Sequence, residues 1–319
     1  MIDDRKLALL QCTICKSDLA NGEDCLICQG CGARYPVVGD IVIMLTRDGL
    51  DSFTGETWGQ ELYKEARGFW PGFTYVCNET DPATLRKIFD EGSSEGRASK
   101  GIMTDEPQGN WGLPDEEFAA ANHSIGAMLQ LCKVPSASTI VDWPTGWGTC
   151  LKQVVKQARP DALVAALEIT FRTLAKIKPY YDDNGYSKNI LFVVADARNL
   201  PLKDSVFQAA TVWGVNEIER PEAGFAETYR VLDSNAWVGT YGEQYAEGSA
   251  SMQISERLGM ASVGTRVRLE SVMAGLGFRD LQYQVLFEGY DHDELPDEER
   301  CPLPARGDWF QCMVAAGQK

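Results

Sequence analysis

The 319-residue sequence has no run of 18 or more apolar residues, which excludes a membrane-spanning helix. Its first ten residues, MIDDRKLALL, lack the long apolar segment of a secretion signal, so we expect a cytoplasmic protein. Basic residues are also scarce, because 30 Lys and Arg stand against 46 Asp and Glu, for a formal net charge of −16. Proteins that bind nucleic acid neutralise its phosphates with Lys and Arg, so this balance argues against a nucleic-acid substrate.

Histidine is nearly absent, with only His123 and His292 in the chain. His123 lies in an expected helix over residues 115–131. There it could take a proton from an acceptor as a general base, or it could be a satisfied structural residue. His292 lies between two aspartates, in what we expect to be an exposed acidic loop.

Cysteine, in contrast, is plentiful, and five of the ten cysteines fall within residues 12–31. Cys12 and Cys15 form one C-x-x-C knuckle, and Cys28 and Cys31 form a second one 12 residues later. Four thiolates in this pairing can enclose Zn²⁺ tetrahedrally, and a closed site of this kind leaves no open position for catalysis. The pattern predicts a zinc ribbon with a structural metal over residues 1–46. Cys25 also forms a C-x-x-C pair with Cys28 and could replace Cys31.

The centre of the chain carries a strand, a tight turn and a helix over residues 139–158. An apolar run leads into Asp142, and a loop with Gly146 and Gly148 then opens onto the helical pattern of residues 151–158. Glycine lets the backbone turn sharply and lets a ligand lie against the main chain. The N–H groups at the start of the helix face the same crevice, outside the carboxyl end of the strand.

Further apolar runs predict the rest of an α/β sheet. Strands are expected at residues 162–167, 190–195, 209–213, 236–241, 281–287 and 309–315, and helices at residues 222–231, 251–260 and 269–275. The first four strand ends bring one set of side chains to a common edge: Asp142, Glu168, Asp196 and Trp213. Acidic residues at successive strand ends are typical of a nucleoside-binding edge.

Residues 47–115 show little periodicity and read as a helical or irregular segment between two domains. Short helices are expected at residues 57–66 and 82–91, followed by a turn-rich stretch over residues 92–109. The segment contains an unusual number of aromatic residues: Trp58, Phe69, Trp70, Phe73, Tyr75 and Trp111. It could cover a pocket as a lid, or it could pack the zinc module against the domain over residues 116–319.

These motifs together resemble the class I S-adenosylmethionine-dependent methyltransferases. The resemblance rests on residues 141–148, on Glu168, on Asp196-Ala197 followed by NLPL, and on WGVNEI and ETYRVLD within residues 211–241. It is strongest toward the subgroup that contains the ubiquinone and menaquinone C-methyltransferases. The N-terminal module, with Tyr35-Pro36, resembles the zinc ribbons of tRNA-methyltransferase activator proteins.

The resemblance implies a Rossmann-like α/β fold, with a seven-stranded methyltransferase sheet and a small N-terminal zinc ribbon. It further implies that Gly146 and Gly148 approach the amino acid part of S-adenosylmethionine, that Glu168 binds the ribose hydroxyls and that Asp196 meets the adenine amino group. The other residues expected at the cofactor are Asp142, Pro144, Ile169, Ala197 and Trp213. Pro144 replaces the usual first glycine of the loop, and proline makes the loop stiffer.

The expected reaction is methyl transfer to a small-molecule acceptor, with His123, Asn216 and Glu217 as candidates for positioning the acceptor or moving its proton. One alternative is an RNA methyltransferase of the rRNA type, because zinc modules precede such domains. Another is a non-catalytic partner module that binds the cofactor and docks a protein through its ribbon. A thiol-based metalloid methyltransferase would use unpaired cysteines, of which the chain has Cys77, Cys132, Cys150, Cys301 and Cys312.

Overall fold

The computed structural model describes residues 1–45, 81–98, 115–215, 218–291 and 303–319, with the backbone alone over residues 115–122. The predicted helix at residues 57–66, Asn216, Glu217 and His292 lie outside the described residues. Within the described part, no helix has the length and apolar character needed to cross a membrane.

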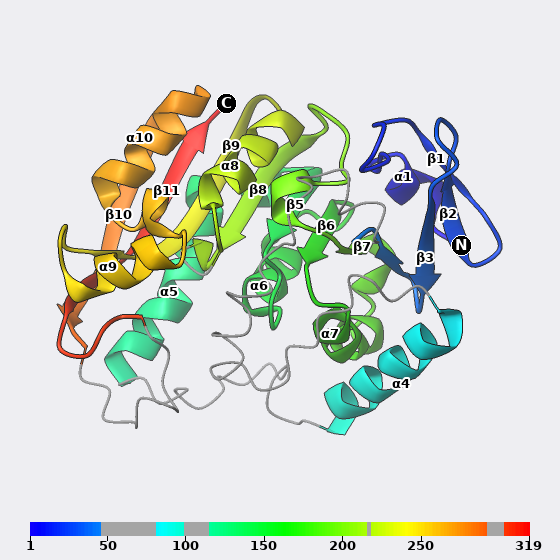
Figure 1. Ribbon diagram of the computed structural model, residues 1–319, viewed down its shortest axis with the longest axis horizontal. Coiled ribbons are helices and arrows are strands. Elements are labelled where there is room, and N and C mark those ends of the chain that lie inside the picture. The colour runs from blue at the N-terminus through cyan, green and yellow to red at the C-terminus, as the bar shows by residue number, and fades with distance from the viewer. Residues whose placement is uncertain (46–80, 99–114, 216–217, 292–302) are drawn as a thin grey trace.

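One mixed sheet forms the centre of the molecule (Figure 1). Seven of its strands follow the order β7-β6-β5-β8-β9-β11-β10, in which β11 runs antiparallel to both of its neighbours. These strands are β5 (Thr139–Trp143), β6 (Leu163–Glu168), β7 (Ile190–Val194), β8 (Phe207–Trp213), β9 (Leu232–Tyr245), β10 (Arg279–Tyr290) and β11 (Trp309–Gln318). All seven predicted strands are therefore confirmed.

The continuous sheet is nevertheless larger than the seven strands expected, because it has eleven strands within the described residues. The N-terminal module adds β1 (Leu19–Asn21), β2 (Cys25–Cys28), β3 (Arg34–Val38) and β4 (Ile41–Ile43). β4 pairs in parallel with β7, where Ile41 lies opposite Phe192 and Ile43 opposite Val194. β7 is the edge strand of the seven, so its free side is open for pairing. The N-terminal module therefore extends the sheet through β4.

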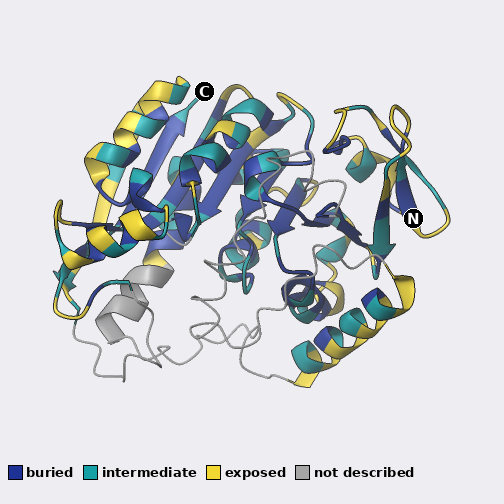
Figure 2. Cartoon of the chain, viewed as in Figure 1, coloured by how far each residue is buried: buried dark blue, intermediate teal, exposed yellow. Residues whose placement is uncertain are grey.

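Helices cover both faces of the sheet (Figure 1). α5 (Asp115–Leu131), α6 (Thr149–Gln157) and α7 (Phe171–Asp183) pack on one face, and α8 (Pro221–Val231) and α10 (Arg266–Leu276) on the other. Strand side chains alternate between the two resulting cores, so that Ile140 faces α5 to α7 and Val141 faces α8 and α10. Figure 2 shows the central strands buried between these layers. Other helical segments in the described part of the chain are α1 (Asp4–Leu7), α9 (Ala250–Arg257), η1 (Val134–Ser136), η2 (Ser187–Asn189), η3 (Ala197–Asn199) and η5 (Ala261–Val263).

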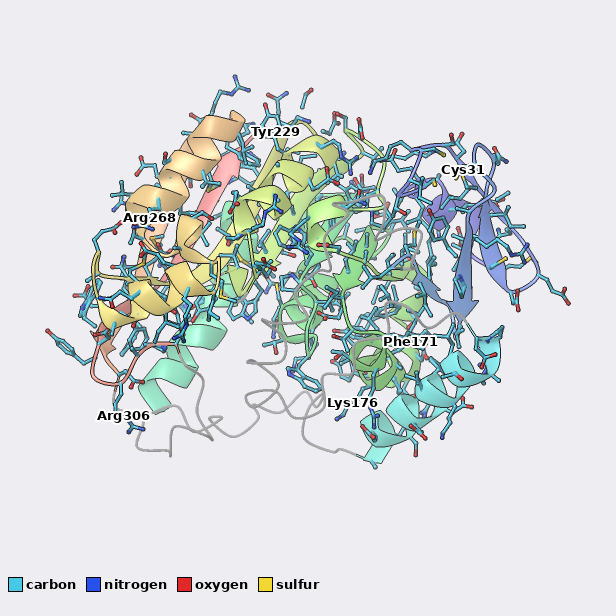
Figure 3. The ribbon with its side chains drawn as sticks, viewed as in Figure 1. Cys31, Phe171, Lys176, Tyr229, Arg268 and Arg306 are labelled. Atoms are coloured by element: carbon cyan, nitrogen blue, oxygen red, sulfur yellow. The ribbon has the colours of Figure 1, made fainter. Side chains whose placement is uncertain are left out.

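Helix α4 (Pro82–Ala98) packs along α7 and is longer than predicted. It begins at Asp81, whose Oδ2 accepts a hydrogen bond of 2.8 Å from the Thr84 N–H, as expected for a capping residue. The turn-rich prediction was wrong for residues 92–98, which are helical. A Cβ at Gly92 would lie 3.0 Å from the Ala175 Cβ, and one at Gly96 would overlap the Lys176 carbonyl oxygen. These glycines therefore permit close approach of two helices rather than a turn (Figure 3 labels Lys176 on α7).

Candidate cofactor site and metal centre

The loop between β5 and α6 contains two glycines whose backbone lies in the left-handed region of φ/ψ space. Gly146 has a φ of +49° and Gly148 a φ of +76°, values that residues with a Cβ adopt only with strain. The Thr145 N–H donates to the Leu167 carbonyl at 2.8 Å, which attaches the loop to β6. Gly148 caps the N-terminus of α6, so the first N–H groups of α6 open beside the loop.

Asp142, at the carboxyl end of β5, lies beneath this loop with an exposed fraction of 0%. Its Oδ1 accepts a hydrogen bond of 2.7 Å from the Thr211 hydroxyl, and its Oδ2 accepts one of 3.0 Å from the Thr145 hydroxyl. Burial raises the pKa of Asp142 to about 6, although these hydroxyls lower it in part. The carboxylate therefore holds the loop on β8, and it would act on a bound cofactor through that loop.

Glu168 ends β6 next to the same loop and is 4% exposed. Its Oε2 accepts from the Gly146 N–H at 2.9 Å, and its Oε1 accepts from the Thr170 N–H at 3.1 Å. Burial raises the pKa of this carboxyl, and the backbone N–H donors oppose that shift. Each oxygen has a further lone pair, so the carboxylate can still accept hydrogen bonds from a ligand.

Asp196 follows β7, whose Val194 pairs with Glu168, so the two acidic strand ends are neighbours. The Arg198 guanidinium binds the Asp196 carboxylate with two nitrogens, Nε to Oδ1 and Nη2 to Oδ2, both at 3.1 Å. Burial raises the pKa of Asp196, while the Arg198 charge lowers it. Sequence reasoning did not single out Arg198, although its place two residues after Asp196 is visible in the sequence.

The two tryptophans of the loop lie in different surroundings. Trp143 is fully buried on the α8 side, where its Nε1–H donates to the Thr228 hydroxyl at 2.8 Å and its ring contacts Phe225 edge-on. It therefore does not fill the space beside Glu168. Trp147 is half-buried, and the Lys176 ammonium lies 5.1 Å from its ring centroid.

The other residues expected at the cofactor lie at the ends of the same strands and are half-buried: Pro144, Ile169, Ala197 and Trp213. The Trp213 ring stacks on Tyr241 of β9, with centroids 4.0 Å apart and planes inclined by 11°. Sequence reasoning missed the residues that bind the carboxylates of Asp142 and Asp196, because a hydroxyl or guanidinium carries no motif signal by itself. They are Thr145, Thr211 and Arg198.

Of the candidate catalytic residues, the structure describes only His123, which is exposed on α5. Asn216 and Glu217 lie outside the described residues, directly after Val215. These three roles remain predictions.

The four predicted metal ligands converge in the N-terminal module. The sulfur atoms of Cys12, Cys15, Cys28 and Cys31 all lie within 4.8 Å of one another. The Cys12 sulfur lies 3.6 Å from that of Cys31, and the Cys15 sulfur lies 3.3 Å from that of Cys28. A tetrahedral site with a Zn–S distance of about 2.3 Å requires sulfurs about 3.8 Å apart, so the arrangement fits Zn²⁺. Figure 3 labels Cys31 in this module.

Cys25 does not belong to this cluster of sulfur atoms. It is buried in β2, and a Cβ on Gly22 would lie 3.1 Å from its sulfur. Cys31 rather than Cys25 therefore completes the group of four. Tyr35, also fully buried, supports the first knuckle because its hydroxyl lies 3.1 Å from the Cys12 sulfur and 3.2 Å from the Thr13 N.

The metal module binds directly to the segment that follows Asp196. The Gln11 N–H donates to the Pro201 carbonyl, and the Lys203 N–H donates to the Leu9 carbonyl, each at 2.9 Å. The Lys16 ammonium donates to the Asn199 side-chain oxygen at 2.9 Å. The module thus supports the strand end that carries Asp196.

Comparison with known proteins agrees with this geometry. Residues 140–235 match the methyltransferase domain family. The ubiquinone/menaquinone biosynthesis C-methyltransferase of Pseudomonas paraeruginosa is 28% identical over 105 residues, which cover 33% of this chain and 41% of that protein. Its counterpart in Bartonella tribocorum is 30% identical over 94 residues, or 29% and 36% of the two chains. The chain therefore spans less than half of the length of either relative.

Two solved structures share the fold at a TM-score of 0.50 and 14% identity. One is the [4+2]-cyclase SpnF, with coverage of 73% of this chain and 93% of that one. The other is phosphoethanolamine N-methyltransferase 2 of Haemonchus contortus, with coverage of 74% and 60%. Residues 140–235 therefore carry a methyltransferase domain, and the fold and the strand-end carboxylates agree with those expected of class I S-adenosylmethionine-dependent methyltransferases. Within that class, the sequence of the domain is similar to the ubiquinone and menaquinone C-methyltransferases.

Proposed function

We propose that the protein transfers the methyl group of S-adenosylmethionine to a small-molecule acceptor. The observation that carries this proposal is the Glu168 carboxylate, which is buried at the end of β6 and held by the Gly146 and Thr170 N–H groups. A carboxylate fixed in this way can accept hydrogen bonds from the two hydroxyls of a ribose without reorganising. Asp196 on the next strand can accept from the adenine amino group.

S-adenosylmethionine supplies an already activated methyl group, so the protein has mainly to position the two reactants. The left-handed turns at Gly146 and Gly148 bring backbone close to the ligand, and Asp142 fixes the loop from below through Thr145. Ile169, Pro144 and Ala197 would provide contact surface beside these groups. No nucleophilic triad is needed for this chemistry.

Two features support a small acceptor. The formal net charge of −16 disfavours a polyanionic substrate, and the similar relatives are named for quinone biosynthesis. We further propose that Zn²⁺ in the four-cysteine cluster is structural, because all four positions of the tetrahedron are filled by thiolates. We also propose three parts of the chain: the zinc ribbon over residues 1–46, a helical or irregular segment over residues 47–115 and the methyltransferase domain over residues 116–319. The proposed location is the cytoplasm.

A labelled-methyl transfer assay tests the acceptor class. Zinc-loaded protein is incubated with methyl-labelled S-adenosylmethionine and, separately, with a small-molecule extract and with purified RNA. We expect label in the small-molecule fraction alone. Label in RNA, together with RNA affinity that falls steeply with salt, would contradict the proposal and support an RNA methyltransferase.

The role of His123 is tested in the same assay once an acceptor has been identified. If this exposed imidazole removes the acceptor proton, His123→Asn lowers the transfer rate by about 10²–10⁴-fold and leaves cofactor affinity unchanged. An unchanged rate would show that His123 has no part in the reaction.

A further inference from the structure

Arg198 is almost completely enclosed, with 1% of its side chain exposed. Its guanidinium makes the two 3.1 Å contacts with Asp196, and its backbone N–H donates to the same carboxylate at 2.8 Å. A charged side chain with this degree of burial is rare unless it is paired. These contacts fix the orientation of the Asp196 carboxylate.

The same guanidinium also reaches a second segment. Its Nη1 donates to Glu219 Oε2 at 3.4 Å, and Glu219 lies between β8 and α8. The next residue, Arg220, donates its N–H to the Gly259 carbonyl at 2.8 Å, just after α9. Gly259 has a φ of +70°, and a Cβ there would lie 3.1 Å from the Glu219 Cγ. Arg198 therefore connects the end of β7 with the start of α8 and, through it, with the turn after α9.

Two carboxylates on α8, close to this connection, have other partners. On α8, Glu227 binds Arg230, and Glu222 accepts a hydrogen bond from the Ser262 hydroxyl. Arg198 forms ion pairs with both Asp196 and Glu219. Its removal would leave the buried Asp196 carboxylate without that partner, and burial of an unpaired charge favours the neutral form.

We propose that Arg198 is a positioning residue that keeps the Asp196 carboxylate oriented for the adenosine group and couples occupancy of that site to Arg220 and Gly259. This inference rests on the proposed function, because it takes Asp196 as an acceptor for the cofactor. A protonated Asp196 carries an O–H donor and loses acceptor capacity toward an amino group. Cofactor affinity should therefore depend on pH when Arg198 is absent.

The experiment measures binding of S-adenosylhomocysteine by calorimetry from pH 6 to pH 9. Arg198→Gln removes the charge, Arg198→Lys keeps the charge but not the bidentate contact, and Glu219→Ala removes the acceptor of the outer contact alone. Arg159→Gln is the matched control, because Arg159 binds Asp161 through the same two nitrogens at 3.1 and 3.0 Å, but on the surface.

We expect Arg198→Gln to weaken binding about tenfold or more at pH 7, since charge-assisted hydrogen bonds are lost. Its affinity should recover as rising pH ionises Asp196, whereas the unaltered protein should show no such rise. Arg198→Lys should bind with intermediate affinity and a weak pH dependence. Arg159→Gln should match the unaltered protein.

Amide hydrogen exchange tests the coupling. Ligand binding should slow exchange of the Arg220 amide in the unaltered protein, and Glu219→Ala, which lacks the acceptor for Arg198, should abolish that slowing while it retains affinity. Equal affinity and an equal pH profile for Arg198→Gln would overturn the orienting role, and if that variant does not fold, Arg198→Lys with unaltered affinity would do so. Retained slowing in Glu219→Ala would overturn the coupling. Failure of the unaltered protein to bind would instead overturn the proposed function.

Discussion

Replacing Asp142 by asparagine separates two effects of this side chain on stability: its hydrogen bonds and its buried negative charge. The amide side chain of Asp142→Asn would keep nearly the same shape as the carboxylate. Its oxygen could accept from the Thr211 hydroxyl, and its NH₂ group could donate to the Thr145 hydroxyl, which can rotate to accept. The substitution therefore preserves the two hydrogen bonds and removes only the buried negative charge.

The magnitude follows from the pKa of Asp142, which burial raises from 3.8 to about 6 in the folded state. Because the folded pKa exceeds the unfolded one, the stability that comes from the protonated carboxyl is complete below pH 3.8 and is lost as pH rises to about 6. At 1.36 kcal/mol per pKa unit, the shift lowers stability by about 3 kcal/mol at pH 8, where the buried carboxyl is ionised. At pH 5 it lowers stability by about 1.5 kcal/mol, because the buried carboxyl takes up a proton that the unfolded chain has lost.

Urea unfolding at pH 5 and pH 8 measures this difference. We expect Asp142→Asn to raise the free energy of unfolding at both pH values, and by about 1.5 kcal/mol more at pH 8 than at pH 5. A variant less stable than the unaltered protein at pH 8, or a difference that does not change with pH, would refute the reasoning. Such a result would show that the hydroxyl donors fully compensate the burial of the charge.

Two further substitutions test the metal centre and the contact between α4 and α7. Cys28→Ser should abolish stoichiometric zinc in metal analysis, whereas Cys25→Ser should retain it, because of these two sulfurs only that of Cys28 lies in the four-cysteine cluster. Equal zinc contents of the two variants would contradict the assignment. Gly96→Ala should lower the free energy of unfolding by about 1–3 kcal/mol, since its Cβ would overlap the Lys176 carbonyl. Gly275→Ala, in α10 with open space around it, should raise it by about 0.5–1 kcal/mol, and stabilisation by both would refute the packing argument.

The strand ends were predictable because they follow simple periodicity. β5, β6 and β7 are each an apolar run that leads into an acidic residue, and parallel strands present their carboxyl ends at one edge. Glu168 and Asp196 could therefore be placed side by side from the sequence. The four-cysteine group was predictable for a similar reason, since its spacing nearly determines its geometry.

Other features depend on contacts between distant segments, which no local pattern contains. Gly92 and Gly96 signal turns in isolation, and only the presence of α7 makes them packing residues. The pairing of β4 with β7 joins residues about 150 positions apart in the chain, and parallel pairing leaves no turn signal between them. The connecting role proposed for Arg198 depends on its contact with Glu219, and sequence periodicity does not predict that contact.

The central claim is that Glu168 anchors an adenosine group, and calorimetric titration with S-adenosylhomocysteine tests it most directly. The zinc-loaded protein should bind one equivalent, and Glu168→Gln should bind about tenfold or more weakly, because an ionised acceptor at the end of β6 is lost. Absence of binding to the unaltered protein, or equal affinity of the two proteins, would contradict the account.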